Sequence, residues 1–271
     1  MIEFDALTKA YGELRAVDGL TLTVRPGEVY ALLGANGAGK TTALRCLATL
    51  LKPTSGTARV AGHDVQVAPL QARAALGFLS ASMGLYQRLT PRELLEYFGR
   101  LHGMAEDTLR ARVEELIELF EIDRFGGRLC GTLSTGQRQR VSIARTVLHD
   151  PPALILDEPT LGLDILSGRA IFTFIDGARK RQRAVLFSTH QMDEVELLAD
   201  RVGVLAGGRL VAEGTIEEVV RGTGQKNLAR AFLHILESGR AGRPMTEAGR
   251  GGGAGSPGPE PGGHPMREAG R

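Results

Sequence analysis

Tryptophan is absent from this 271-residue sequence, aromatic residues make up 5% of it, and there are only two cysteines, Cys46 and Cys130. The cysteine spacing matches no metal-binding or disulfide pattern, so we expect two free thiols in a reducing compartment. No apolar run approaches the roughly 18 residues needed to cross a bilayer. The opening residues, MIEFDALTKAYG, lack the apolar core of a signal peptide. We therefore expect a soluble, cytoplasmic chain that something else must anchor if it works at a membrane.

A strong charge of either sign is also lacking, because the formal net charge is only +2. The segment from Ser238 onward holds five arginines and three glutamates, a surplus of 5 − 3 = +2, so the rest of the chain is neutral. We therefore expect no nucleic-acid partner. With 42% hydrophobic and 24% charged residues, the composition is that of one large globular domain or a domain with a lobe.

The pattern of apolar runs and turn residues predicts an α/β fold. Thr90 and Glu93 predict a capping box at the start of a helix whose first residue is Pro91. The residues after Ser238 are about half glycine and proline, and we expect them to be disordered. The other predicted elements are strands at Ile2–Leu7, Leu20–Val24, Val29–Leu33, 56–65, 153–156 and 184–187, a hairpin around Gly207–Gly208, and helices at Lys40–Leu50, 109–120, 134–149 and Leu228–Glu237.

The residues GANGAGKT (34–41) fit the pattern G-x-x-x-x-G-K-[ST] and lie between an apolar strand and a helix, the context that a phosphate-binding loop needs. Gly34 permits the sharp turn, the side chain of Lys40 would pair with phosphate oxygens, and Thr41 would offer a hydroxyl to Mg²⁺. A glycine-rich turn that binds nothing is the weaker alternative in this context. The predicted nucleotide-binding residues are Gly34, Ala35, Asn36, Gly37, Ala38, Gly39, Lys40, Thr41 and Thr42.

Acidic and histidine side chains follow two apolar strands. Asp157 and Glu158 end the run ALILDE, where Asp157 would meet Mg²⁺, usually through water, and Glu158 would polarise an attacking water. His190 ends AVLFSTH and would reach the terminal phosphate from the same edge of the sheet. Tyr11 would stack on a purine ring. The alternatives are an acidic helix cap, a structural histidine and a tyrosine packed on a turn.

A second anion-binding helix end is predicted at LSTGQRQRV (133–141). Ser134 and Gln137 have capping-box spacing, and Gly136 has no side chain to block an approaching ligand. One small domain would then carry two phosphate-binding helix ends.

The order GANGAGKT, LSTGQ, LILDEP, LGLD and STH resembles the nucleotide-binding subunit of ATP-binding cassette (ABC) transporters over roughly residues 1–220. The resemblance implies a P-loop NTPase (RecA-like) core with an antiparallel β subdomain and an inserted α-helical subdomain. It places the ATPase domain at 1–222, the helical subdomain at about 88–150, a C-terminal helix at 223–237 and the disordered tail at 238–271.

The resemblance also implies roles for matching residues. Tyr11 is the adenine-stacking aromatic residue, Asp157 the magnesium ligand, Glu158 the catalytic glutamate, and His190 and Lys40 contact the phosphates. Asp164 lies in a loop that crosses the dimer. Ser134, Gly136 and Gln137 belong to the family signature, which faces the phosphate loop of a second copy with ATP between them. This explains the two phosphate-binding helix ends.

As in this family, we expect a Mg²⁺-dependent ATPase that works as a homodimer at the cytoplasmic face of the membrane and drives a separate integral membrane permease. The segment LYQRLTPRELLEYFGRLHGM resembles the sodium-extrusion branch of the exporters. The cargo is therefore expected to be sodium or a small toxic compound. Two departures are Thr135, where the family usually has glycine, and Ala81, where it usually has glutamine.

The alternatives are an importer ATPase and a non-transport ABC ATPase of the translation or DNA-repair type. The repair type inserts a long coiled coil between the phosphate loop and the signature, and no sustained heptads appear here. The translation type carries two cassettes in one chain, and this chain has one.

Overall fold

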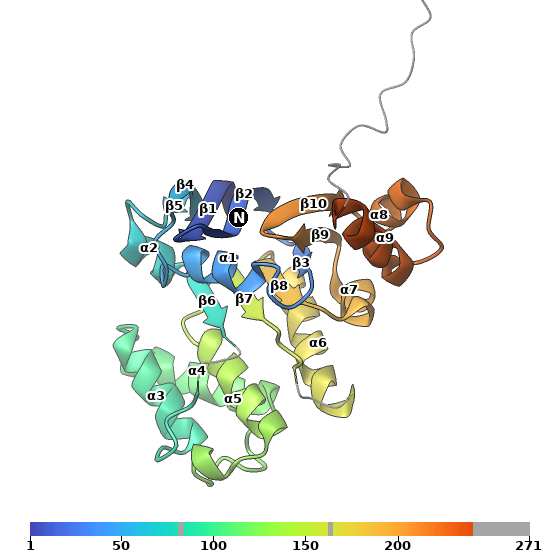
Figure 1. Cartoon of the computed structure of the whole chain (residues 1–271). Helices are drawn as coiled ribbons and strands as arrows, with labels where there is room; N and C mark the ends of the chain where they lie inside the picture. Colours follow the sequence, from blue (N-terminus) through green and yellow to red (C-terminus); the bar gives the residue numbers. More distant parts are fainter. Residues whose placement is uncertain (81–83, 162–164, 241–271) are drawn as a thin grey trace, which may run out of the picture.

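The computed structural model describes residues 1–80, 84–161 and 165–240 (Figure 1). Ala81, Asp164 and the tail from residue 241 lie outside the described residues, so the predictions made for them stay predictions. Cys46 and Cys130 are free, as predicted, and both are buried.

Two β-sheets form the upper part of the molecule in Figure 1. Their strands are β1 (Ile2–Tyr11), β2 (Leu14–Val24), β3 (Val29–Leu33), β4 (Ser55–Val60), β5 (His63–Asp64), β6 (Leu76–Leu79), β7 (Ala153–Asp157), β8 (Ala184–Thr189), β9 (Arg201–Ala206) and β10 (Arg209–Gly214). The larger sheet has the order β10-β9-β3-β8-β7-β6 and is parallel except for the β9–β10 hairpin. The smaller sheet, β2-β1-β4-β5, is antiparallel.

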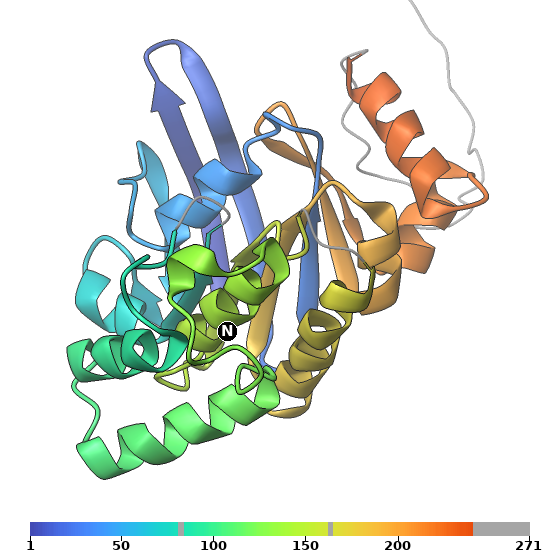
Figure 2. The ribbon, with the colours of Figure 1, turned by 90° about the horizontal axis from the view of Figure 1, so that it is seen from below.

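Helices lie on both faces of the larger sheet. They are α1 (Lys40–Leu47), α2 (Pro69–Ala74), α3 (Pro91–Leu101), α4 (Glu106–Leu119), α5 (Thr135–Thr146), α6 (Ile165–Lys180), α7 (Met192–Leu198), α8 (Ile216–Thr223) and α9 (Leu228–Arg240). Helices α3, α4 and α5 form a separate lobe, seen below the sheets in Figure 1 and from another side in Figure 2. The expected architecture, a P-loop core with an antiparallel sheet and an inserted helical lobe, is confirmed.

Strand β3 shows why the central strands are apolar throughout. Val29, Ala31 and Leu33 point into one core cluster, which the helical lobe and α6 share. Tyr30 and Leu32 point into a second cluster, which packs against α1 and the smaller sheet. Successive side chains of a strand face opposite sides, so a strand covered on both faces has no solvent-facing position for a polar residue.

The helical lobe begins at the predicted capping box. The hydroxyl of Thr90 accepts a hydrogen bond from the Glu93 amide, and the Glu93 carboxylate accepts one from the Thr90 amide. The predicted apolar stripe of α4 is buried in the core cluster that the helical lobe shares, and α4 packs against α3. The stripe consists of Leu109, Val113, Leu116 and Ile117, and Phe120 lies just beyond α4.

Several element boundaries differ from the prediction. The helix expected to reach Leu50 ends at Leu47, and Thr49 takes a positive φ of 61°, which no α-helix contains. The helix expected to reach residue 149 ends at Thr146, whereas the last helix continues beyond Glu237 to Arg240. The elements β6, α2, α6, α7 and α8 were not predicted.

Candidate nucleotide-binding site

The glycine-rich loop joins the carboxyl end of β3 to the start of α1, as its sequence predicts. Gly39 has a φ of 108°, and a β-carbon built there would lie 2.2 Å from the carbonyl oxygen of Ala16. A β-carbon on Gly34 would lie 2.6 Å from the carbonyl oxygen of Leu205. The loop is therefore packed so closely against β2 and β9 that both positions require glycine.

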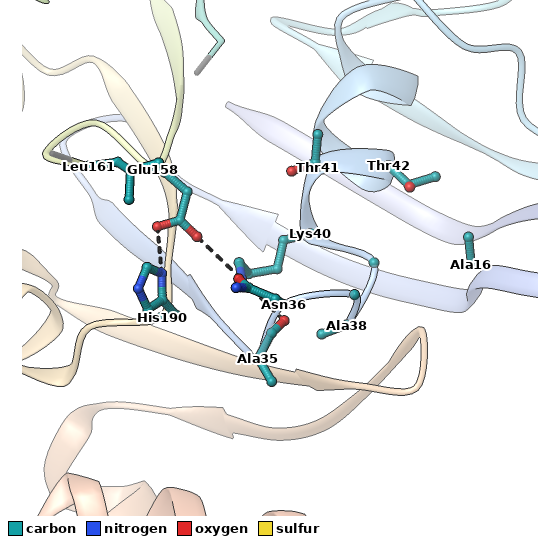
Figure 3. A pocket seen from close by; sticks show the side chains of 12 residues that line it. Ala16, Ala35, Asn36, Ala38, Lys40, Thr41, Thr42, Glu158, Leu161 and His190 are labelled. Carbon is teal, nitrogen blue, oxygen red and sulfur yellow. Dashed lines mark hydrogen bonds and ion pairs between the residues drawn. The ribbon is translucent and has the colours of Figure 1, made fainter. Parts of the chain in front are cut away.

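This loop forms one wall of a cavity of about 280 Å³. The cavity lies at the carboxyl edge of the parallel strands, where open α/β sheets bind their ligands. Residues from three strand ends meet there, as Figure 3 shows. The lining consists of Ala16, Ala35, Asn36, Gly37, Ala38, Gly39, Lys40, Thr41, Thr42, Glu158, Leu161 and His190.

Glu158 lies between Lys40 and His190. Its Oε1 is 3.4 Å from Lys40 Nζ, and its Oε2 is 2.8 Å from His190 Nδ1. A carboxylate is only an acceptor, so Nδ1 carries a proton in this hydrogen bond. The Lys40 ammonium also donates to the Gly34 carbonyl at 2.6 Å. The backbone arranges a cation, a carboxylate and an imidazole around the same cavity.

Thr41 and Asp157 lie side by side next to this trio. The Thr41 hydroxyl donates to Asp157 Oδ1 at 3.2 Å, and the Asp157 side chain is almost completely buried. Hydroxyl and carboxylate oxygens are the kinds of ligand that Mg²⁺ prefers, so these two side chains would suit one ion. Among the described residues there is no group of three acidic, histidine or cysteine side chains that could hold a metal alone. The pair thus suits an ion completed by phosphate and water oxygens.

The residues around Ser134 lie elsewhere. The predicted capping box of α5 is confirmed, because the Ser134 hydroxyl accepts from the Gln137 amide and the Gln137 side chain accepts from the Ser134 amide. Ser134, Gly136 and Gln137 are in the helical lobe and do not line the cavity. Tyr11, at the end of β1, is half-exposed and also lies outside the lining, with Lys9 over its ring.

Ser188 is a residue at the site that the sequence reasoning missed. It is fully buried, donates to Asp157 Oδ1 at 2.6 Å and accepts from the Glu158 amide at 3.2 Å. The available signal was the change from apolar to polar residues in AVLFSTH, two positions before His190. Ala16 and Leu161 were missed as well, because an apolar wall residue has no distinctive local pattern.

The family model described as ABC transporter matches residues 17–161 of this chain. The chain is 39% identical over 227 residues to the ABC transporter ATP-binding protein NatA of Bacillus subtilis, covering 83% of this chain and 92% of NatA. It is 42% identical over 237 residues to the daunorubicin/doxorubicin resistance ATP-binding protein DrrA of Streptomyces peucetius, covering 88% and 72%.

Solved structures of ABC transporter cassettes have the same fold as this chain. The structure of an ATP-binding subunit of an ABC transporter superposes with a TM-score of 0.81 at 28% identity, covering 87% of this chain and 99% of that one. The cassette MJ0796, a dimer bound to ADP and Pi, superposes with a TM-score of 0.73 at 27% identity, covering 79% and 98%. The chain therefore belongs to the ABC transporter family, as one of its ATP-binding subunits.

Proposed function

We propose that this chain binds ATP with Mg²⁺ in the cavity beside the glycine-rich loop and hydrolyses it to drive export through a separate integral membrane permease. The observation that carries the proposal is the meeting of Lys40, Glu158 and His190 at one cavity, next to the Thr41–Asp157 pair.

Each side chain has a task that its chemistry suits. Lys40 and the loop amides bind the phosphates, and Thr41 and Asp157 hold the metal. Bound Mg²⁺ would neutralise charge on the phosphate oxygens. Glu158 accepts a proton from the attacking water, and His190 donates a hydrogen bond toward the terminal phosphate. Tyr11 stacks on the adenine.

A second copy of the chain completes the site. Ser134, Gly136 and Gln137 do not line the cavity of their own chain, which supports a role for their helix end at the nucleotide of a partner. Two identical sites then follow from one symmetric interface. The ATP-bound dimer is the closed state, and loss of the terminal phosphate opens it.

The permease places the subunit at the cytoplasmic face of the membrane. Within the described ranges, none of the helices combines the length and apolar character that crossing a bilayer requires. Two relatives support export: DrrA is named for daunorubicin/doxorubicin resistance, and a relative from Paraburkholderia xenovorans, 40% identical over 213 residues, is named for Nod factor export. The proposed cargo is sodium or a small toxic compound.

The proposal is tested with the purified chain, alone and after co-expression with candidate permeases from the same genome. We expect Mg²⁺-dependent ATP hydrolysis that Lys40→Ala abolishes, and co-purification of one such permease from detergent extracts. Lys226→Ala, at an exposed lysine, is the matched control and should behave as wild type. Hydrolysis that survives Lys40→Ala, or no recovery of any candidate permease, would contradict the assignment.

A further inference from the structure

Ser188 is a buried hydroxyl that contacts both acidic residues of the site. It lies on β8 directly opposite Asp157 of β7 in the parallel register, and its relative exposure is 0%. We propose that Ser188 is a positioning residue that holds the metal-binding carboxylate and the catalytic glutamate in one fixed geometry. This inference rests on the proposed function, because it assigns Ser188 a part in the same site.

The first contact is with Asp157. Ser188 Oγ donates to Asp157 Oδ1 at 2.6 Å, and the Thr41 hydroxyl donates to the same oxygen at 3.2 Å. Thr41 is also the proposed metal ligand, whereas Ser188 is not and can serve the carboxylate alone. Ser188 therefore helps to keep the Asp157 carboxylate from rotating.

The second contact is with the backbone of Glu158. Its amide donates to both the carbonyl oxygen of Ser188 at 3.1 Å and the hydroxyl oxygen at 3.2 Å. Glu158 has a φ of 50°, a left-handed conformation that residues other than glycine rarely adopt. The backbone persists there only if its surroundings hold it. The two bonds to Ser188 do so, and they direct the Glu158 side chain toward Lys40 and His190.

The Ser188 hydroxyl thus donates to Asp157 and accepts from the amide of Glu158. A hydroxyl has one proton and can accept from other donors, so one side chain satisfies both needs. A shift of Asp157 on metal binding would be passed through Ser188 to the amide of Glu158. Metal binding and placement of the base would then be coupled at this residue.

The test measures the Mg²⁺ requirement as well as the rate. The variants are Ser188→Ala, which removes the hydroxyl, and Ser188→Thr, which keeps it. Loss of a group that orients a metal ligand typically weakens metal binding roughly 10- to 100-fold. In calorimetric titrations with ATPγS, we expect Ser188→Ala to need at least about 10-fold more Mg²⁺ for half-maximal binding. Its kcat should fall by a similar factor while KM for ATP stays within a few-fold, and Ser188→Thr should restore both.

Thr189→Val is the matched control. Thr189 is the next residue, is equally buried and also bears a hydroxyl, but it donates to Glu194 and accepts from the Gln191 amide. Its loss should lower the melting temperature without changing the Mg²⁺ requirement. If Ser188→Ala does not fold, the same measurements are made on Ser188→Cys, because a thiol keeps the side-chain volume but is a weak donor. It should show the same rise in Mg²⁺ requirement.

A folded Ser188→Ala or Ser188→Cys with the wild-type Mg²⁺ requirement and kcat would overturn the inference. Asp157→Asn and Glu158→Gln separate this from failure of the proposed function. If those two variants are inactive and the Ser188 variants are not, only the role of Ser188 is lost. If Asp157→Asn and Glu158→Gln remain fully active, the assignment of the site itself fails.

Discussion

Lys40 Nζ lies 3.4 Å from Glu158 Oε1, so the lysine that we propose to bind phosphate and the carboxylate that we propose to activate water form an ion pair. Both side chains are largely buried, with exposures of 6% and 12%. We expect the phosphates of a bound nucleotide to compete with Glu158 for Lys40, which would free the carboxylate. The pair would then link nucleotide binding to availability of the proposed base.

Glu158→Gln should retain ATP binding and lose hydrolysis. Glutamine has the shape of glutamate but cannot accept the proton of water, and loss of a positioned base typically costs roughly 10²–10⁴ in rate. Single-turnover hydrolysis and equilibrium binding measure the two effects separately. Glu196→Gln, at an exposed glutamate on α7, should leave both unchanged. A wild-type single-turnover rate in Glu158→Gln would remove Glu158 from its proposed role.

Ser134→Arg should abolish ATP-driven dimerisation but not nucleotide binding by the monomer. Arginine breaks the capping box of α5 and places a bulky side chain where the partner's nucleotide must fit. Loss of the cap itself should cost only about 0.5–2 kcal/mol of stability. Size-exclusion chromatography with ATP in the Glu158→Gln background is the measurement.

Thr90→Arg is the control for Ser134→Arg. It breaks the equivalent capping box of α3 in the same lobe and has the same bulk and charge. It should lower stability by a similar amount and leave the ATP-bound dimer intact. An unchanged dimer peak for Ser134→Arg would show that the signature helix does not cross the interface.

Gly39→Ala should destabilise the nucleotide-free chain more than Gly37→Ala does. Both glycines have positive φ, 108° and 80°, but only at Gly39 would a β-carbon meet other atoms, 2.2 Å from the Ala16 carbonyl oxygen. Strained backbone alone costs roughly 1–3 kcal/mol at either position. Gly39→Ala must in addition push the loop away from β2. Urea unfolding without nucleotide compares the two, and equal losses would contradict the close packing of this loop.

Acidification should destabilise the fold partly through His149. Its ring stacks on His102 with centroids 4.0 Å apart, and its Nε2 lies 3.2 Å from the Leu76 carbonyl oxygen. Burial, and to a lesser extent the neighbouring His102, lowers the pKa of His149 to about 4. Burial lowers the pKa of His102 as well. Nδ1 of His149 is buried and has no hydrogen-bond partner among the described residues, so a proton there would lack an acceptor.

The sign of the effect follows from these directions. Unfolded histidine takes up a proton near pH 6.5, whereas folded His149 resists protonation until about pH 4. The unfolded state therefore binds more protons in this window, and the free energy of unfolding falls as the pH drops from about 6.5 toward 4. His149→Gln should flatten that fall in urea titrations between pH 7.5 and 5. His63→Gln, at an exposed histidine, should not, and equal slopes for wild type and His149→Gln would refute the prediction.

Local sequence patterns predict much of the secondary structure. The strand Val29–Leu33 and the capping boxes at Thr90 and Ser134 depend on neighbouring residues, so their sequence patterns predict them correctly. Strand β6 and helix α6 were missed. For β6, the four residues Leu76–Leu79 become a strand because β7 lies beside them, and a run this short has little periodicity of its own.

The sequence alone determined the family, the glycine-rich loop and the choice of Asp157, Glu158 and His190 as candidates, because each lies in a short motif of contiguous residues. Only the tertiary structure decided that Lys40 pairs with Glu158 and that Ser188 joins Asp157 to Glu158. These contacts link residues 118, 31 and 30 positions apart, as the differences 158 − 40, 188 − 157 and 188 − 158 show. Such contacts depend on the order and register of β3, β8 and β7, which hydrogen bonding between distant strands sets and no local pattern records.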